Sequence, residues 1–417
     1  MNIKPTVYIK THGCKLNQSD TLTLNNEFHA NGYELTNNEQ DADVVVLNTC
    51  TVTSTADSKA RQYINTTTRK HPDALVVITG CYAQSQSKQL TEMYTNCLVL
   101  GNEDKPNLVA KVSEKINQTE LDIPSFLPNL NKTRAMVKIQ EGCNQVCAYC
   151  IVPKVRGREK SIPVHHIISQ INKYHSQGFQ EVVLTGTQLG TYGFETPGTT
   201  LRYLLEEILQ STSIPRIRVS SLQAHEIDSS LLLLWQDQRL QNHLHIPLQS
   251  GDNTVLENMR RKYTTEEFKT AVEMTREIIS DVSITTDWII GFPGETDQQF
   301  ENSVNFVKST KFADIHPFTY STRAGTSAAY MSMHVSATVK KTRMSLALHL
   351  KSASSMAFKQ SMIGKQFPVL WESYDKNEHA IGYTANYIRV NGTRTRNNNV
   401  ITNEVLQELK DDGTVLC

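Results

Sequence analysis

Short apolar runs and longer polar stretches alternate along the first third of the chain. The runs at residues 7–9, 44–47 and 75–78 are aliphatic or aromatic at every position, a pattern typical of parallel strands that are buried on both faces. Polar stretches compatible with helices lie between them, at residues 19–31 and 56–69. This order of strand, helix and strand predicts an open, parallel α/β domain.

The middle of the chain repeats a similar alternation six times. Amphipathic stretches such as residues 164–177, 201–210 and 265–280 separate short apolar runs. Repeats of strand and then helix predict a parallel barrel, incomplete at six strands, with functional groups at the carboxyl ends of the strands. The predicted strands are residues 136–140, 181–185, 216–220, 244–248, 283–290 and 314–320.

A long helical stretch at residues 338–360 ends this pattern, and short predicted strands follow it. Pro368 near the start of the first strand suits an edge position, and Asn391-Gly392 predicts a hairpin turn. These features predict a small β-barrel at the carboxyl end of the chain. Its strands are predicted at residues 367–371, 380–383, 387–390, 400–401 and 405–409.

The length of 417 residues is enough for two or three domains, and the patterns place them at residues 1–120, 130–360 and 361–417. The 42 basic residues equal the 42 acidic ones, so a nucleic-acid partner would have to bind local patches. No apolar run is long enough to span a bilayer, and no signal peptide precedes the first strand. We therefore predict a cytoplasmic protein without a membrane partner, whose eight cysteines stay reduced.

Three of the cysteines form the compact motif Cys-x3-Cys-x2-Cys at Cys143, Cys147 and Cys150. Three thiolates in so short a loop can hold three corners of a cubane iron–sulfur cluster and leave one iron open for a chelating molecule. Structural zinc is an alternative, although it usually takes a closed set of four ligands. Disulfides are a second alternative, but three clustered cysteines leave one unpaired.

Cys14, Cys50 and Cys81 each follow one of the apolar runs of the first domain. They are 36 and 31 residues apart, and each separation fits one βαβ unit. Because ligands gather at the carboxyl ends of strands in an open α/β sheet, we expect these thiols to converge and to bind a second iron–sulfur cluster. Ordinary buried cysteines and a zinc site are the alternatives.

The spacing of the cysteine loop resembles that of the radical S-adenosylmethionine (radical SAM) superfamily. Taken together with the three strand-end cysteines, it is similar to the methylthiotransferase family, and the resemblance covers essentially the whole chain. One branch of that family acts on tRNA bearing N6-threonylcarbamoyladenosine. The stretches that resemble this branch are residues 13–17, 48–53, 56–62, 150–153 and 156–158.

The resemblance implies a central partial (β/α)6 radical SAM barrel, two [4Fe-4S] clusters, and S-adenosylmethionine bound at the cysteine loop. It implies that a radical made from S-adenosylmethionine attacks carbon 2 of the adenine at position 37 of tRNA, where C–H becomes C–S–CH3. The cluster of the strand-end cysteines would supply the sulfur. The implied partners are an adenosine of the tRNA anticodon loop and a low-potential electron donor such as flavodoxin or ferredoxin.

A cofactor pocket at the barrel strand ends is also implied by the resemblance. Gly186 and Thr187 occupy the stretch that contacts the methionine amino group of the cofactor in the family, and Ser220, Gln249 and Asp287 are further candidates. Taken without the family, the position of these residues predicts turn chemistry equally well.

Residues 382–390 resemble the TRAM domain, which binds RNA. Tyr387 offers a stacking face, and basic side chains near it and near the cysteine loop offer phosphate contacts. A solvated surface is the alternative for each of them. The predicted RNA-binding residues are Arg156, Arg158, Arg261, Tyr387, Arg389 and Arg394.

Two rival functions stay open at this point. The first is methylthiolation of isopentenyl-adenosine in tRNA or of an aspartate in a ribosomal protein, and analysis of the modified product distinguishes it. The second is a zinc-held RNA-binding protein without turnover, which would contain neither iron nor sulfide.

Overall fold

The structure is a computed structural model that describes residues 4–116, 133–393 and 397–417. The chain divides into two compact units. The first comprises Met1–Asn131, Glu141–Asn144 and Cys150–Glu159, and the second comprises Lys132–Gln140, Gln145–Tyr149 and Lys160–Cys417. The cysteine loop therefore contributes residues to both units, and the C-terminal sheet belongs to the same unit as the barrel. Division into three domains stays a prediction.

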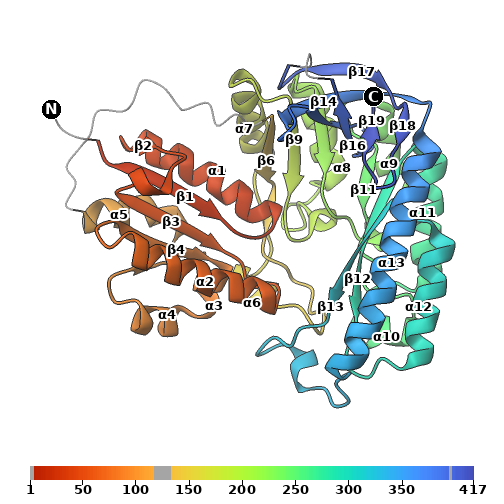
Figure 1. The fold of residues 1–417 in the computed structure, drawn as a ribbon, viewed down its shortest axis with the longest axis horizontal. Coiled ribbons are helices and arrows are strands. Elements are labelled where there is room, and N and C mark those ends of the chain that lie inside the picture. Colours follow the sequence, from red (N-terminus) through yellow and green to blue (C-terminus); the bar gives the residue numbers. More distant parts are fainter. Residues whose placement is uncertain (1–3, 117–132, 394–396) are drawn as a thin grey trace. The chain divides into compact units, whose positions relative to one another are not determined.

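A five-stranded parallel sheet forms the centre of the first unit, with the strand order β2-β1-β3-β4-β5 (Figure 1). Every residue of the middle strand, β3, is buried, because neighbours pair with it on both edges and helices cover both faces. The open parallel sheet predicted from the apolar runs is thus confirmed. The strands are β1 (Thr6–Thr11), β2 (Glu34–Leu35), β3 (Val44–Thr49), β4 (Leu75–Gly80) and β5 (Leu98–Val99).

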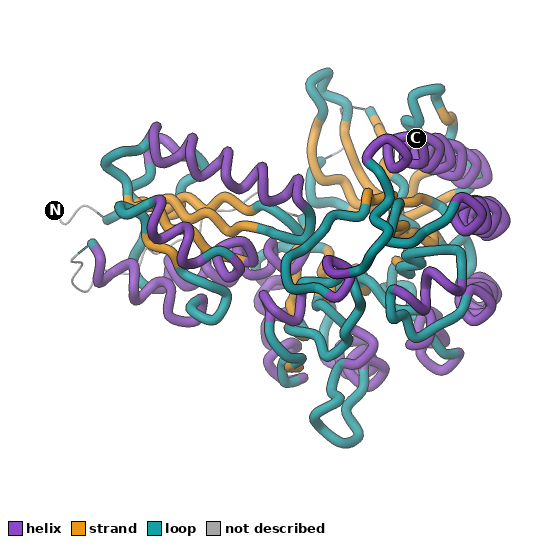
Figure 2. Tube along the Cα trace, turned by 90° about the horizontal axis from the view of Figure 1, so that it is seen from below, coloured by secondary structure: helices purple, strands orange, loops and turns teal. Residues whose placement is uncertain are grey.

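Helices pack on both faces of this sheet (Figure 2). On one face Phe28 packs in a core with Val46, and on the other Ile64 packs with Val45, since successive side chains of a strand point to opposite faces. The first face is covered by α1 (Lys15–Ala30) and α5 (Leu108–Lys115), and the second by α2 (Ser54–Lys70), α3 (Cys81–Ser85) and α4 (Ser87–Met93).

Six parallel strands form the partial barrel of the second unit. They form two sheets of three, β10-β9-β6 and β11-β12-β13, which a parallel bridge between Ser221 and His245 connects. All six predicted strands are present, and the largest difference is in β11, which ends at His245 rather than at residue 248. The strands are β6 (Arg134–Lys138), β9 (Glu181–Thr185), β10 (Arg216–Val219), β11 (His243–His245), β12 (Ser283–Ile290) and β13 (Asp314–Thr319).

Helices follow the barrel strands along the chain (Figure 1). The long helix α13 (Ala337–Met362) then leads to the C-terminal sheet. Among the described residues, no helix is both long enough and apolar enough to cross a membrane. The helices between the strands are α7 (Val164–Ser176), α8 (Leu201–Ser211), α9 (Ser229–Leu232), α10 (Asn253–Asn258), α11 (Thr265–Ile278) and α12 (Asp297–Thr310).

The C-terminal strands form one curled sheet with the order β17-β14-β15-β16-β19-β18. Its core contains Trp371, which is fully buried, together with Val369 and Val390. The strands are β14 (Gln366–Tyr374), β15 (Ala380–Thr384), β16 (Arg389–Gly392), β17 (Ile401–Val405), β18 (Glu408–Leu409) and β19 (Val415–Leu416).

Two local predictions for this sheet are wrong. Pro368 does not lie in an edge strand, since β14 pairs with β17 on one side and with β15 on the other; pairing with β15 begins only at Val369. Asn391-Gly392 is not a hairpin turn but the end of β16, where Gly392 pairs with Ala380. A Cβ at Gly392 would lie 2.4 Å from Cη2 of Trp371, so packing against the indole, not turn geometry, requires glycine there.

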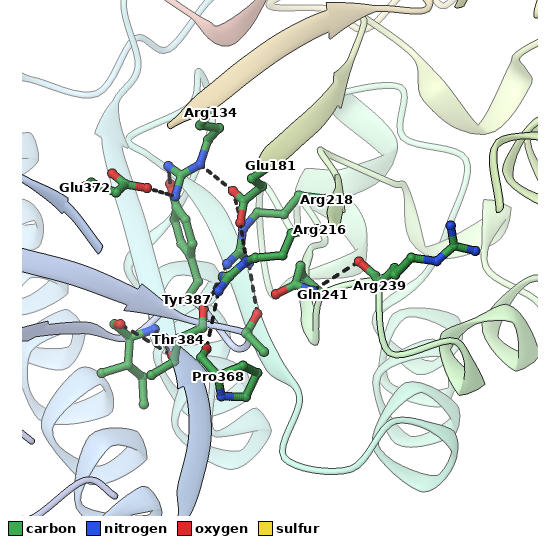
Figure 3. Close-up of polar contacts among 12 residues, drawn as sticks. Arg134, Glu181, Arg216, Arg218, Arg239, Gln241, Pro368, Glu372, Thr384 and Tyr387 are labelled. Atoms are coloured by element: carbon green, nitrogen blue, oxygen red, sulfur yellow. Dashed lines mark hydrogen bonds and ion pairs between the residues drawn. The ribbon is translucent and has the colours of Figure 1, made fainter. Parts of the chain in front are cut away.

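A buried ionic network joins the start of the barrel strands to the C-terminal sheet (Figure 3). The carboxylate of Glu181, with no exposed surface, accepts from Arg216 Nε at 2.8 Å, from Arg218 Nε at 2.9 Å, and from Arg134. Both Arg216 and Arg218 also donate to the carbonyl oxygen of Thr384, and Arg134 pairs with Glu372. Burial alone would raise the pKa of Glu181, but the three guanidinium groups outweigh it and lower the pKa to about 2.

Candidate active site

The strand ends of the first unit bring Cys14, Cys50 and Cys81 to one edge of the sheet. Cys14 precedes α1, Cys50 follows β3, and Cys81 is the first residue of α3. Two glycines permit the close approach. A Cβ at Gly13 (φ +121°) would lie 2.6 Å from Cβ of Cys50, and one at Gly80 (φ +95°) would lie 2.3 Å from the carbonyl oxygen of Thr49. Larger residues would therefore force the strand ends apart.

The three thiols lie close enough to affect one another electrostatically. The pKa of the Cys50 thiol is raised to about 11, mainly by burial; Cys14 and Cys81 contribute to the rise, while a backbone hydrogen bond and the charge of Arg156 oppose it. A bound metal cluster would reverse this balance, because thiolates are its ligands and binding releases their protons. Three converging thiols with a guanidinium beside them fit an anionic thiolate cluster.

Arg156 is the residue that the sequence did not connect with these cysteines. Its Nε donates to Sγ of Cys81 over 3.2 Å, and its Nη1 donates to Asp20 at 2.9 Å and Glu141 at 2.6 Å. Its Nη2 donates to Oδ1 of Asn17 at 2.5 Å. The side chain is only 2% exposed, so these contacts do not favour the predicted RNA contact of Arg156. That prediction assumed that a charged residue in a basic stretch faces solvent.

Spacing within the cysteine sets bears on the choice between zinc and a cluster. Over the described part of the chain, no three His, Cys, Asp or Glu side chains are grouped closely enough to hold one metal ion. A single zinc ion needs its ligands within one coordination sphere, whereas a cubane binds each thiolate through a different iron. The two alternatives therefore require different spacings of the same thiols, and the iron and zinc contents of the protein distinguish them.

The cysteine loop follows β7 (Gln140–Glu141) at the carboxyl end of the first barrel strand. In the first unit, the backbone N–H of Cys143 donates to the carbonyl of Gly157 at 3.1 Å, and the N–H of Val152 donates to Sγ of Cys150 at 3.4 Å. Gly142 has a φ of +75°, and a Cβ there would lie 1.9 Å from the carbonyl oxygen of Arg158. The chain can enter the loop in this way only with glycine at that position.

In the second unit, Arg261 contacts the middle cysteine of the loop. Its Nη1 donates to Sγ of Cys147 at 3.2 Å and to the hydroxyl of Tyr149 at 3.5 Å, while its Nη2 donates to Gln223 at 2.5 Å. The guanidinium also lies 4.9 Å from the ring centre of Tyr263. These contacts direct Arg261 toward the loop, which argues against the predicted RNA contact.

Hydrogen bonds at the backbone fix the centre of the loop against the barrel. The N–H of Ala148 donates to the carbonyl of Met259 at 3.0 Å, and its carbonyl accepts from the N–H of Ala328 at 2.7 Å. Ala148 is also buried in a cluster with Phe292 and Tyr320. The loop is therefore held at Ala148, between the two cysteines that flank it.

Gly186 and Thr187 follow β9, as predicted, and contact the buried amide of Gln140. Oε1 of Gln140 accepts from the N–H of Thr187 at 2.9 Å, from its hydroxyl at 3.1 Å, and from the N–H of Gln188 at 3.0 Å. A Cβ at Gly186 would lie 2.9 Å from Gln140. Gln140, Gln188 and Gln223 were not predicted as site residues from the sequence. Gln188 accepts from Gln223 at 2.5 Å, and a glutamine at or just beyond each strand end was the available signal.

The other predicted pocket residues also lie at barrel strand ends or within β12. Ser220 and Gln249 are buried, and Gln249 has a left-handed φ of +66°, which is strained for a residue with a side chain. Asp287 lies in β12, with its carboxylate 3.3 Å from Nε2 of His245. Nδ1 of His245 lies 3.0 Å from the hydroxyl of Thr285. Asp287 thus has the partner that a carboxylate inside a strand requires.

The remaining predicted RNA-binding residues differ from one another. Arg158 and Arg389 are exposed, whereas Arg394 lies outside the described residues. Tyr387 is stacked on Tyr383, with ring centres 5.2 Å apart, and the guanidinium of Arg218 lies 4.5 Å from its ring centre. Because both neighbours lie against the ring of Tyr387, a base cannot stack on it without displacing them, and the predicted stacking role is not favoured.

Two family models match separate parts of the chain. Residues 6–101 match the family described as "Uncharacterized protein family UPF0004", and residues 137–307 match the radical SAM superfamily. The first match covers the strand-end cysteines, and the second covers the cysteine loop and most of the barrel.

Curated relatives resemble nearly the whole chain. The threonylcarbamoyladenosine tRNA methylthiotransferase MtaB of Bacillus subtilis is 36% identical over 92% of this chain and 90% of its own length. The protein of that name from Aquifex aeolicus is 36% identical over 87% and 92%. The tRNA-2-methylthio-N(6)-dimethylallyladenosine synthase of Bacillus subtilis is 34% identical over 90% and 78%.

Among solved structures, the radical S-adenosylmethionine methyltransferase TsrM of Kitasatospora setae, with cobalamin and a [4Fe-4S] cluster bound, matches with a TM-score of 0.56. It covers 76% of this chain and 75% of that protein at 15% sequence identity. At this identity the likeness concerns the fold alone.

Proposed function

The chain belongs to the radical SAM methylthiotransferase family, and from this premise we propose that it converts N6-threonylcarbamoyladenosine at position 37 of tRNA to its 2-methylthio derivative. The observation that carries the proposal is the presence of two separate cysteine trios in a chain that is 36% identical to MtaB over nine-tenths of its length. A C–H bond of adenine is too inert for acid–base chemistry, which explains the need for radical chemistry.

Enzymes of this family use S-adenosylmethionine and two [4Fe-4S] clusters. We assign one cluster to the loop of Cys143, Cys147 and Cys150. The strand-end cysteines, Cys14, Cys50 and Cys81, would hold the auxiliary cluster. When bound, these groups supply the radical, the sulfur and the methyl group of the reaction. The chain itself provides the ligands, the positions of the reactants and the exclusion of water.

The barrel strand ends would hold S-adenosylmethionine beside the cysteine loop. We assign its pocket to Gly186, Thr187, Ser220, Gln249 and Asp287. Their support is the position at or just beyond the carboxyl ends of consecutive strands, where barrels of this class bind their substrates; Asp287 differs in lying within β12. Gln140 holds the segment after β9 through three hydrogen bonds, two from backbone N–H groups and one from the hydroxyl of Thr187, which keeps that side of the pocket rigid before the cofactor binds.

The substrate is a tRNA, and we place the reacting adenosine in the anticodon loop. Its base must leave the stack to bring carbon 2 to the barrel. The exposed Arg158 and Arg389 are the remaining candidates, among the described residues, from the predicted phosphate contacts. A reduced flavodoxin or ferredoxin would deliver the electron, and the reaction would take place in the cytoplasm, where these partners occur.

The decisive experiment is anaerobic purification followed by turnover on defined tRNA. We expect iron and sulfide for two clusters, and formation of the 2-methylthio nucleoside by mass spectrometry when the tRNA carries N6-threonylcarbamoyladenosine. The matched control is the same tRNA with unmodified adenosine at position 37. Turnover only on isopentenyl-adenosine, or only on a ribosomal protein, would move the chain to another branch of the family. A colourless protein with zinc would refute an enzymatic role.

A further inference from the structure

We propose that Arg156 is a positioning residue of the auxiliary cluster. Its hydrogen bond to the sulfur of Cys81 holds that cysteine in place and raises the reduction potential of the cluster. The inference rests on the auxiliary cluster of the proposed function. It replaces the role in RNA binding that the sequence suggested for this arginine, and it concerns contacts within the first unit only.

The geometry around Arg156 is that of a fixed donor. All three nitrogens of the guanidinium donate hydrogen bonds. Nε donates to Sγ of Cys81 at 3.2 Å, Nη1 to two carboxylates, and Nη2 to Asn17 at 2.5 Å. Because the guanidinium is planar, these partners define the plane in which Nε–H points at the sulfur. The side chain is 2% exposed, so the contact is shielded from water and from salt.

Charges around Arg156 are balanced. Asp20 accepts from Arg156 at 2.9 Å and from Lys105 at 2.5 Å, and Glu141 accepts from Arg156 at 2.6 Å. Two cations and two carboxylates are thus joined beside Cys81. Loss of the guanidinium would remove the donor to sulfur and leave one excess negative charge next to the site. Both changes make an added electron less favourable, so both lower the potential of a cluster held there.

The origin of Arg156 in the sequence gives this contact a further meaning. It is the last residue of α6 (Val152–Arg156) and comes six residues after Cys150 of the cysteine loop. Nδ2 of Asn102 donates to the carbonyl of Val155 at 2.7 Å and lies 3.6 Å from Sγ of Cys81. The segment that follows the cysteine loop is therefore hydrogen-bonded at Val155 and Arg156, to Asn102 and to Cys81 itself.

The test isolates the auxiliary cluster. In a protein with Cys143→Ala, Cys147→Ala and Cys150→Ala, the only cluster expected is that of the strand-end cysteines. We compare this parent with its Arg156→Gln and Arg156→Lys forms by iron and sulfide content, by the electron paramagnetic resonance of the reduced state, and by a redox titration without tRNA. We expect Arg156→Gln to shift the potential to a lower value and to speed iron loss to a chelator. The potential of Arg156→Lys should lie between those of the parent and of Arg156→Gln, because lysine keeps the positive charge but lacks the planar set of guanidinium donors.

The matched control is Arg158→Gln, which makes the same change of charge on an exposed side chain two residues away and should leave the potential at the parent value. An iron-loaded Arg156→Gln protein with the parent potential and the parent rate of iron loss overturns the inference. If Arg156→Gln binds no iron, the redox potentials of Arg156→Lys and Glu141→Gln are measured in its place. Potentials equal to that of the parent in both variants overturn the inference. A parent without iron and sulfide refutes the auxiliary cluster itself, a result distinct from an unchanged potential.

Discussion

The two cysteine trios use an arginine in different ways. Arg156 and Arg261 each donate to one sulfur of a trio over 3.2 Å. The charge of Arg156 is compensated by the carboxylates of Asp20 and Glu141, whereas Arg261 contacts a glutamine, tyrosines and a thiol. Over the described residues, no carboxylate forms an ion pair with Arg261. The hydrogen bond from Arg156 to Cys81 therefore has a fixed direction, whereas Arg261 places an uncompensated positive charge beside Cys147.

The way in which the two trios are assembled explains this difference. Cys143, Cys147 and Cys150 lie within eight consecutive residues, so the loop needs little more than local geometry and a compensating charge. Cys14, Cys50 and Cys81 come from three separate strand ends, and a movement of any strand separates the thiols. At the second kind of site, an ion-pair network opposes such movement, because it links Asp20 of α1 to Lys105 and to Arg156.

The largest effect is expected from removing one ligand of each trio. Cys147→Ala should abolish cleavage of S-adenosylmethionine and product formation, because the cluster loses the ligand in the centre of its loop. Cys50→Ala should retain cleavage but yield no methylthio product. Quantification of 5′-deoxyadenosine and of tRNA nucleosides by mass spectrometry checks both. Full methylthiolation by Cys50→Ala would contradict the division of labour between the trios.

Next in size is the cost of breaking the network at the strand-end trio. Asp20→Asn leaves Arg156 and Lys105 buried without the carboxylate they share, and such changes cost about 3–5 kcal/mol of unfolding free energy. Urea unfolding of the metal-free protein measures it. The control is Asp104→Asn, which removes the half-exposed partner of Lys111 and should cost at most about 1 kcal/mol. Equal costs in the two variants would show that the network is not a structural requirement.

A smaller effect is expected at the loop, where no carboxylate among the residues that the structure describes pairs with Arg261. Arg261→Gln removes a charged donor to Cys147, and a hydrogen bond of this class contributes about 1.5–3 kcal/mol, or roughly ten- to a hundredfold in S-adenosylmethionine cleavage. Arg261→Lys should restore part of the rate, since it keeps the charge. Unchanged cleavage in Arg261→Gln would remove the basis of the contrast between the two arginines.

The smallest effect is a pH dependence of the strand-end trio in the metal-free protein. Because burial raises the pKa of Cys50 to about 11, its thiolate fraction should still be rising well above neutral pH. We expect its alkylation rate to increase about tenfold per pH unit up to that value. In urea the same peptide should level off near pH ~8.5, the ordinary range of a thiol. Alkylation that levels off at the same pH in both conditions would indicate an exposed Cys50.

The sequence was sufficient for most of the elements and for picking out the two cysteine trios, whose role as cluster ligands stays a prediction. Apolar runs that end in Cys50 and Cys81 coincide with β3 and β4, because a strand buried on both faces has a composition that few other elements share. Predictions for charged and turn residues were less successful. Arg156 looked like part of a basic surface, and Asn391-Gly392 looked like a turn, although one is buried and the other pairs within a strand.

By itself the sequence determined the patterns that depend on near neighbours. These are the strand and helix periods, the spacing of the cysteine loop, and the resemblance to a family. Tertiary structure alone decided the partners of Arg156, since Asn17, Asp20 and Cys81 are 139, 136 and 75 residues away from it. A hydrogen bond depends on direction within a fraction of an ångström, and no local pattern of residues records the direction of a side chain that distant. For that reason the two cysteine trios could be picked out from the chain, but the contacts of Arg156 and Arg261 with them could not.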